Sequence, residues 1–156
     1  MNMTARFAKS SDIPMIHKFR NDEITRKASY NTGSVSLEEY TKYYMDFFCV
    51  VLVETELLNS RDCLFVLTLK QTIDSNPGHY TIGYFMNPEY RGKRLSSACL
   101  STALDFVEDY LKIKTLTAMV AVDNTPSHCV MKRQEGWQYD SIGGHLHQRY
   151  VKIFQK

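Results

Sequence analysis

The feature that most constrains the fold is a strand-like run, a short basic turn and a helix-like run in direct succession. The strand-like run covers residues 80–86, the turn covers 87–94 and the helix-like run covers 95–111. The turn ends with the cations Arg91, Lys93 and Arg94. A helix start leaves backbone N–H groups unpaired and carries partial positive charge, so it favours a phosphate or diphosphate. The segment therefore predicts an anion-binding turn between a strand and a helix.

The length and charge of the chain favour one globular domain. Its 156 residues are 44% hydrophobic and 23% charged, which is enough apolar material for a buried core. We therefore interpret residues 1–156 as a single domain. The formal net charge is only +2. Nucleic-acid binders usually show a clearly basic face, so this balance argues against nucleic acid as a partner.

The cysteines and the hydropathy pattern predict a reduced, cytoplasmic protein without a metal site. The cysteines are Cys49, Cys63, Cys99 and Cys129. They lie in apolar or helical runs without the paired spacing of zinc or redox sites, and we interpret them as reduced core thiols. No signal peptide is evident, and no apolar run approaches the roughly 20 residues that span a bilayer, so no membrane association is expected. His145 and His147 alternate on one predicted strand without further ligands, so we assign no metal.

The periodicity along the chain predicts a mixed sheet covered by helices. Capping signals followed by apolar residues at helical spacing predict helices that begin near residues 13, 36, 95 and 125. Apolar or alternating runs predict strands over 4–8, 49–53, 63–69, 79–86, 116–122, 139–142 and 148–154. The order along the chain is therefore one strand, two helices, three strands, one helix, one strand, one helix and two strands.

This order carries two motifs that resemble those of the GNAT superfamily of acyl-CoA-dependent N-acetyltransferases, over nearly the whole chain. The first is YFMNPEYRGK at residues 84–93, which is similar to the family's fourth strand and its diphosphate loop. The second is DNTPS at residues 123–127, followed after a helical stretch by Gly136-Trp137. The first half, with FRND at residues 19–22 and SLEE at residues 36–39, is similar to the branch of ribosomal-protein N-terminal and nucleotide-amino-sugar acetyltransferases.

The resemblance implies an α/β (α+β) fold, the GNAT fold, in which a mixed, mostly antiparallel seven-stranded sheet is flanked by four helices. It implies an acetyl-CoA-dependent N-acetyltransferase that transfers an acetyl group to a primary amine by direct attack in a ternary complex. The acceptor would be a protein N-terminus, an amino sugar or a small amine. The resemblance also implies a homodimer.

The family's loop pattern assigns residues to the coenzyme. It reads Gln or Arg, two residues, Gly, one residue, then Gly or Ala, so Arg91 matches the first position while Arg94 and Ser96 replace the small residues. A β-carbon there hinders close approach of backbone to phosphate, whereas Arg94 adds hydrogen-bond donors. The N–H of Met86 would act as an oxyanion donor, and Asn124 would contact the pantetheine arm. The full set is Met86, Arg91, Gly92, Lys93, Arg94, Leu95, Ser96, Ser97 and Asn124.

The resemblance assigns the proton-transfer residues less directly. Many family members carry a tyrosine on the helix seven positions after the asparagine, and here that position is Met131. Ser127 lies four residues before Met131 and shares its helical face, so its hydroxyl, or a water that it holds, is the predicted proton donor. Tyr80 lies six residues before Met86, where some relatives carry a base. As a neutral phenol of pKa about 10, Tyr80 suits the anchoring of a water. We therefore predict Tyr80 and Ser127 as the catalytic residues.

Two alternatives stay open. Because Arg94, Ser96 and Met131 each replace a residue that the family usually employs, the chain could keep the fold and coenzyme A but not catalysis, as a sensor or an interaction module. The basic turn could also dock on nucleic acid or a ribosome, which the modest net charge argues against.

Overall fold

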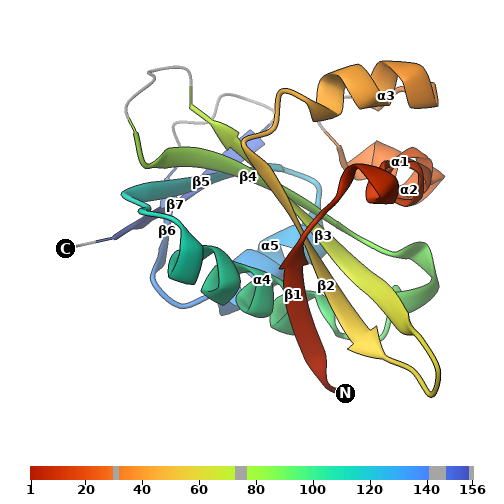
Figure 1. Cartoon of the computed structure of the whole chain (residues 1–156). Coiled ribbons are helices and arrows are strands. Elements are labelled where there is room, and N and C mark those ends of the chain that lie inside the picture. Colours follow the sequence, from red (N-terminus) through yellow and green to blue (C-terminus); the bar gives the residue numbers. More distant parts are fainter. Residues whose placement is uncertain (30–31, 73–76, 141–146, 155–156) are drawn as a thin grey trace.

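The computed structural model of the chain describes residues 1–29, 32–72, 77–140 and 147–154. At its centre is a seven-stranded sheet with the order β1-β2-β3-β4-β5-β7-β6, drawn in Figure 1. The strands are β1 (Met3–Phe7), β2 (Cys49–Glu56), β3 (Arg61–Gln71), β4 (His79–Met86), β5 (Thr115–Ala121), β6 (Trp137–Asp140) and β7 (His147–Ile153). Among these described strands, β4 and β5 form the one parallel pair. The predicted mixed, mostly antiparallel sheet is confirmed.

Helices cover both faces of this sheet. They are α1 (Ile13–Asn21), α2 (Glu23–Ala28), α3 (Leu37–Tyr44), α4 (Ser96–Tyr110) and α5 (Thr125–Arg133), with 3₁₀ turns at Ser10–Asp12 and Pro88–Tyr90. In Figure 1, α1, α2 and α3 gather on one side of the sheet, while α4 and α5 lie on the other. The four longer helices were predicted, but α2 was not. Its six residues are too few for an apolar periodicity, although Asp22 caps its start.

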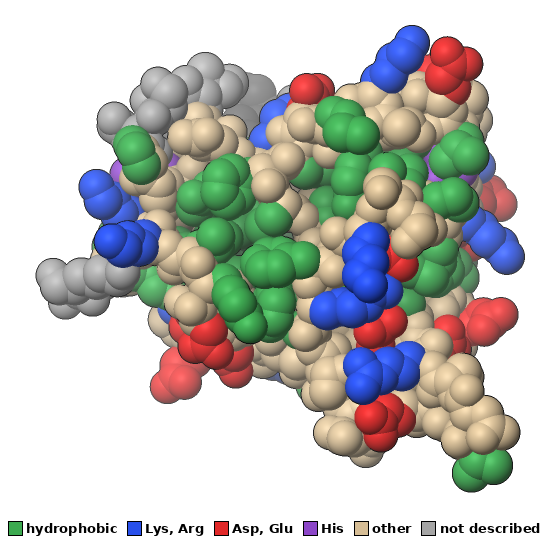
Figure 2. All heavy atoms as spheres, viewed as in Figure 1, with side chains coloured by type: hydrophobic (Ala, Val, Ile, Leu, Met, Phe, Trp, Pro, Cys, Tyr) green, Lys and Arg blue, Asp and Glu red, His purple; other side chains and the backbone are tan. Residues whose placement is uncertain are grey.

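Helix α4 forms because apolar residues recur along it at helical spacing. Its buried residues are Cys99, Leu100, Ala103, Leu104 and Val107. Phe106 packs against the edge of this core, whereas Tyr110 is 65% exposed. Both rings contact Phe7 of the edge strand β1, at centroid distances of 4.8 and 5.5 Å. In the view of Figure 2, hydrophobic side chains gather on the molecular surface between α3 and α4.

The cysteines differ in their exposure. Cys63 and Cys99 are buried, and burial raises the pKa of each thiol to about 12, which agrees with their prediction as core thiols. Cys49 is half-buried at the start of β2. Cys129 is exposed, so its assignment to the core was wrong. On α5 the neighbouring residues His128 and Val130 are buried, and Cys129 between them lies on the solvent side.

An ion-pair network fixes β1 to the start of the helical layer. The guanidinium of Arg6 donates to both carboxylate oxygens of Asp12, at 2.8 and 3.0 Å, and to Glu54 at 2.9 Å. Glu54 is only 8% exposed. The hydrogen bonds from Arg6 lower the pKa of Asp12 below its ordinary value. Among the described residues, Arg6 is the cation that pairs with Glu54.

The substitution Arg6→Met is expected to lower the free energy of unfolding by about 2 to 3 kcal/mol, because it leaves the carboxylate of Glu54 buried without a cation. The Arg6 side chain is itself 33% exposed, so the expected loss is smaller than the roughly 3 to 5 kcal/mol of a fully buried pair. Urea unfolding at neutral pH measures the loss. Adding Glu54→Gln should restore at least half of it; no restoration would mean that lost packing, not unpaired charge, causes the loss.

Candidate active site

Strands β4 and β5 separate near their carboxyl ends. Their parallel pairing ends at Ile82 and Ala118. Beyond this point β4 stays paired with β3, and β5 stays paired with β7. Residues 83–86 of β4 and 119–121 of β5 therefore face one another without a shared ladder, and we name this opening the wedge. It lies where α4 and α5 begin, at the carboxyl ends of two parallel strands, which is a common position for ligand sites in α/β sheets.

The N–H of Met86 points into the wedge. The next N–H along the chain, that of Asn87, donates to the carbonyl of Leu64 on β3 at 2.8 Å. Successive N–H groups of a strand point to opposite edges, so the N–H of Met86 points away from β3 and toward β5. Because pairing with β5 has already ended, this donor is available to a carbonyl oxygen placed in the wedge.

The loop after β4 is anchored to β3 at two points. Asn87 is 4% exposed; its amide donates to the carbonyl of Cys63 at 2.8 Å, and its side-chain oxygen accepts the N–H of Glu89 at 3.0 Å. The hydroxyl of Tyr90 donates to Asp62 at 2.6 Å, and this hydrogen bond raises the pKa of Tyr90 to about 12. The loop is thus fixed by its own side chains before any ligand binds.

The backbone from Gly92 to Ala98 carries a series of unpaired N–H groups, which we name the amide row. None of them donates to another residue in the described part of the chain, and no side chain caps the start of α4. Gly92 and Arg94 have φ values of 75° and 58°, left-handed conformations that turn the chain into the helix. A β-carbon placed on Gly92 would meet no atom within 4 Å. Open space beside exposed amides and a helix N-terminus is the environment that binds phosphate groups.

Ser97 adds a hydroxyl at the same place. Its oxygen is buried and has no hydrogen-bond partner among the described residues. A buried polar group without a partner costs about 1 to 3 kcal/mol, so a phosphate oxygen that accepts this proton would remove the cost. The amide row and Ser97 therefore fit a diphosphate.

The larger residues of the loop do not disrupt this geometry. Arg94 adopts the left-handed backbone that glycine adopts freely, at a cost of about 1 to 2 kcal/mol, and its side chain is exposed. Lys93 is also exposed, with its ammonium 5.1 Å from the ring centroid of Tyr90. Leu95 directly precedes the first helical residue, Ser96, and both are half-buried. Two cations thus remain at the surface beside the amide row.

On the other side of the wedge, α5 places Ser127 against Tyr84. The side-chain oxygen of Asn124 caps this helix by accepting the N–H of Ser127 at 3.3 Å. The hydroxyl of Ser127 shares a hydrogen bond with the hydroxyl of Tyr84. Tyr84 lies beyond Ile82 and so belongs to the wedge, its ring stacks on Phe65 at 5.6 Å, and burial raises its pKa to about 12. A strand and a helix thus bring two hydroxyls together beside the opening.

Tyr80 and Met131 lie away from these hydroxyls. Tyr80 is in the paired part of β4, is 7% exposed and packs its ring 4.9 Å from that of Phe48. Six residues of strand place it about 20 Å from Met86. Met131 is 1% exposed and fills the core. The structure brings Ser127 to the wedge and leaves Tyr80 outside it.

Sequence reasoning missed Tyr84 and His128. Tyr84 is two residues before Met86 and therefore on the same strand face, a signal that the sequence contained. His128 is 9% exposed, and its ring contacts the hydroxyl of Tyr150 at 2.7 Å and the carbonyl of Ala121 at 2.9 Å. Because a carbonyl only accepts, Nε2 of His128 carries a proton. This imidazole ties the end of β5 to α5 and so fixes the helix below the wedge.

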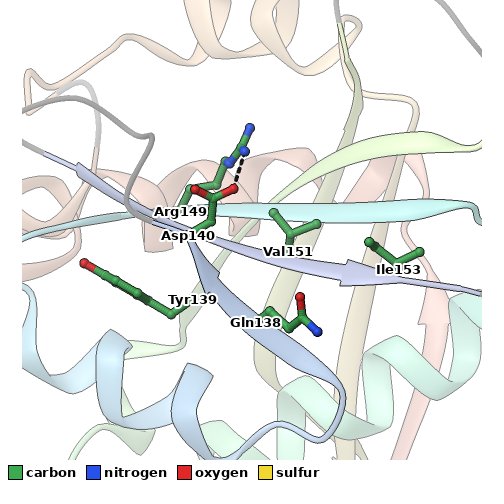
Figure 3. A pocket seen from close by; sticks show the side chains of 6 residues that line it. All are labelled: Gln138, Tyr139, Asp140, Arg149, Val151 and Ile153. Atoms are coloured by element: carbon green, nitrogen blue, oxygen red, sulfur yellow. Dashed lines mark hydrogen bonds and ion pairs between the residues drawn. The ribbon is translucent and has the colours of Figure 1, made fainter.

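A pocket of about 490 Å³ lies on the outer strands instead of at the wedge. Figure 3 shows its lining, Gln138, Tyr139 and Asp140 from β6 and Arg149, Val151 and Ile153 from β7, with an ion pair between Arg149 and Asp140. Strands β6 and β7 lie beyond β5, on the side away from β4. The pocket is therefore separate from the loop that carries the amide row.

No group of three or more His, Cys, Asp or Glu side chains in the described ranges could hold a metal ion, and His145 of the predicted histidine pair lies outside those ranges. None of the helices in the described part of the chain combines the length and apolarity needed to cross a bilayer.

Solved structures of other proteins share this architecture. One is a domain from Methanocaldococcus jannaschii DSM 2661, with a TM-score of 0.80 and 15% identity, covering 98% of this chain and 99% of that chain. Another is spermidine N-acetyltransferase from Vibrio cholerae in complex with CoA and spermine, with a TM-score of 0.79 and 17% identity, covering 97% and 95%. A third is ribosomal-protein-alanine N-acetyltransferase from Brucella melitensis, with a TM-score of 0.73 and 17% identity, covering 96% and 99%. At these identities the likeness establishes the fold.

A match to a family model establishes the family of this chain. Residues 2–135 match the family described as the acetyltransferase (GNAT) domain. No curated protein sequence matches the chain. The matched range includes both motifs, at residues 84–93 and 123–127, and it extends from β1 to the end of α5. With the sheet, the wedge and the amide row in place, we conclude that the chain belongs to the GNAT acetyltransferase domain family.

Proposed function

We propose that the protein is an acetyl-CoA-dependent N-acetyltransferase that acts on a primary amine. The observation that carries this proposal is the amide row at the start of α4, together with the buried hydroxyl of Ser97. These donors suit the diphosphate of coenzyme A, and the exposed cations Lys93 and Arg94 suit its remaining phosphate charge. The residues proposed to bind the coenzyme are Met86, Arg91, Gly92, Lys93, Arg94, Leu95, Ser96, Ser97 and Asn124.

The chain's own groups would divide the work of acyl transfer. Acetyl-CoA supplies the acetyl group as a thioester, and the acceptor amine displaces the thiolate directly in a ternary complex. The N–H of Met86 donates to the carbonyl oxygen as negative charge develops there. Asn124 uses its side-chain oxygen as the cap of α5, so its amide protons remain for the pantetheine arm.

The acceptor decides whether a base is needed. A lysine-like amine has a pKa of about 10.4 and must lose a proton before it attacks, whereas an α-amino group, with a pKa of about 7.7 to 8.0, is already partly neutral. The wedge has hydroxyls but, among the described residues that line it, no carboxylate or imidazole contacts them. This composition favours an α-amine or another weakly basic amine.

We assign stabilisation of the departing sulfur to the Tyr84 and Ser127 hydroxyls. Tyr84 has a pKa of about 12, whereas an ordinary thiol has one of about 8.5. Transfer of the tyrosine proton to the thiolate is therefore unfavourable, because the two pKa values differ by roughly 3.5. The pair acts by donating a hydrogen bond to the thiolate, with Tyr84 donating to Ser127 and Ser127 donating onward.

The substitution Tyr84→Phe is expected to lower kcat by about 10-fold to 100-fold, because it breaks this pair and leaves the thiolate less stabilised. Because its pKa is about 12, Tyr84 should add no ionisation to the pH dependence of kcat below about pH 10.

The matched control is Tyr80→Phe, which removes a tyrosine hydroxyl four residues earlier on the same strand and tests the catalytic role predicted from the sequence. From its place in the core, we expect kcat within about twofold of the wild type. Thiol release at saturating acetyl-CoA measures both, and equal losses would contradict the assignment to Tyr84.

Release of free thiol from acetyl-CoA in the presence of an amine panel tests the function itself. The names of similar structures, spermidine N-acetyltransferase and ribosomal-protein-alanine N-acetyltransferase, supply two acceptors for the panel, a polyamine and a peptide N-terminus. An amino sugar is the third. Thiol release above the rate without amine supports the proposal, whereas coenzyme binding without release would support a sensor or interaction module.

Three properties that the sequence analysis expected stay predictions. They are membership of the ribosomal-protein or amino-sugar branch, the homodimer and the cytoplasmic location.

A further inference from the structure

Arg91, in the loop between β4 and α4, contacts helix α2 and its capping residue. Its Nη2 donates to the carboxylate of Asp22 at 2.5 Å and to the hydroxyl of Thr25 at 2.6 Å. Thr25 is 7% exposed, and the side chains of Arg91 and Asp22 are 28% and 26% exposed. Helix α2 lies on the side of the sheet opposite α4, as Figure 1 shows. Arg91 therefore connects the loop that precedes α4 to a helix on the other face.

Asp22 is held in place by its own helix. The carboxylate oxygen that accepts from Arg91 also accepts the N–H groups of Ile24 and Thr25, at 3.1 and 3.2 Å, and so caps α2. Desolvation by burial raises the pKa of Asp22, but the hydrogen bonds from Arg91 and from the helix N–H groups outweigh it and keep that pKa below its ordinary value. A carboxylate fixed in this way sets the orientation of the guanidinium.

Arg91 has donors left for a ligand. Both contacts to α2 use Nη2, and within the described residues neither Nε nor Nη1 donates to a partner. A guanidinium is planar, with five donors in a rigid arrangement, so fixing one nitrogen fixes the direction of the others. The next residue, Gly92, begins the amide row. The remaining donors thus lie beside the groups that fit a diphosphate.

We propose that Asp22 and Thr25 are positioning residues for the coenzyme, which hold Arg91 so that its remaining donors bind a coenzyme phosphate. The inference rests on the proposed function, since it needs a phosphate ligand at the loop. It makes α2 part of the coenzyme site without direct contact. Binding of the coenzyme would therefore also restrain α2 through Arg91.

The substitution Asp22→Asn is the primary test, because asparagine caps a helix as well as aspartate but carries no charge. We expect the affinity for acetyl-CoA, measured by calorimetry, to fall about 5-fold to 10-fold. Thr25→Val keeps the shape of the side chain and should weaken binding by a smaller factor of about 3. The matched control is Glu23→Gln, which makes the same charge change one residue along. Glu23 pairs with Lys27 at 3.2 Å on the exposed surface, so affinity should stay within about twofold.

A double-mutant cycle with Arg91→Lys separates positioning from a general structural defect. If Asp22 acts through Arg91, then Asp22→Asn should change affinity by less than about twofold once Arg91 is lysine. Hydrogen exchange gives an independent measure: acetyl-CoA should slow exchange of the α2 amides in the wild type, and less so in Asp22→Asn.

The outcomes distinguish this inference from the proposed function. Weaker binding by Asp22→Asn that depends on Arg91 supports it. If Asp22→Asn binds acetyl-CoA as tightly as the wild type, or more tightly, or loses the same factor in both backgrounds, the positioning role is overturned and the proposed function stands. If the wild type itself does not bind acetyl-CoA, the proposed function fails, and this inference fails with it.

Discussion

The substitution Ser97→Asp is expected to lower the affinity for acetyl-CoA more than about 100-fold while leaving the protein at least as stable as the wild type. A carboxylate in the first turn of α4 interacts favourably with the unpaired N–H groups and the helix dipole, by about 0.3 to 1 kcal/mol. The same carboxylate occupies the donors of the amide row and repels the diphosphate. Binding and stability should therefore change in opposite directions, which a simple folding defect cannot produce.

Calorimetry with acetyl-CoA and thermal unfolding of the free protein measure these two effects. Thr102→Asp is the matched control, since it adds the same charge to α4 five residues further on, where the hydroxyl of Thr102 donates to the carbonyl of Ala98 at 2.8 Å. We expect it to keep the affinity within about threefold. If Ser97→Asp binds acetyl-CoA as the wild type does, the diphosphate does not lie at the start of α4.

The substitution Met86→Pro is expected to lower kcat about 100-fold to 1,000-fold, because proline has no N–H and the proposed oxyanion donor is lost. This N–H is the one that points away from β3, so its removal breaks no hydrogen bond of the β3–β4 ladder. The Met86 side chain is 9% exposed, so any replacement also loses packing.

Met86→Ala provides the comparison for that loss. It removes the same side chain but keeps the N–H, so the ratio of kcat between the alanine and proline variants reports the amide alone. Thiol release at saturating acetyl-CoA gives both values. Similar kcat values for the two variants would show that the Met86 N–H takes no part in the reaction.

Much of the fold was predictable because its central elements have strong local patterns. The strand over residues 79–86 was predicted with the bounds that β4 has, and the helix over 95–111 differs from α4 by one residue at each end. Strand β6 begins at Trp137, two residues before the predicted start at 139, and residues 141 and 142 of the predicted strand lie outside the described ranges. It is an edge strand with no fully buried residue, so its sequence lacks the alternation that fixes a strand's position.

The site was predictable only where its parts are consecutive in the sequence. The loop and the start of α4 form one continuous segment, so its sequence alone suggested an anion site. The contacts that complete the site join residues far apart: Arg91 lies 69 positions from Asp22, and Ser127 lies 43 positions from Tyr84. These pairs depend on how α2 packs against the loop and how α5 packs against β4. Neither arrangement is encoded in a local pattern.

The central claim is that the backbone of residues 92–98 holds the diphosphate of coenzyme A, and backbone amide NMR tests it most directly. In a titration of ¹⁵N-labelled protein with acetyl-CoA, we expect saturable shifts that are largest at the amides from Gly92 to Ala98, with a further shift at Met86. No saturable shift at millimolar acetyl-CoA, or shifts confined to β6 and β7, would contradict the claim.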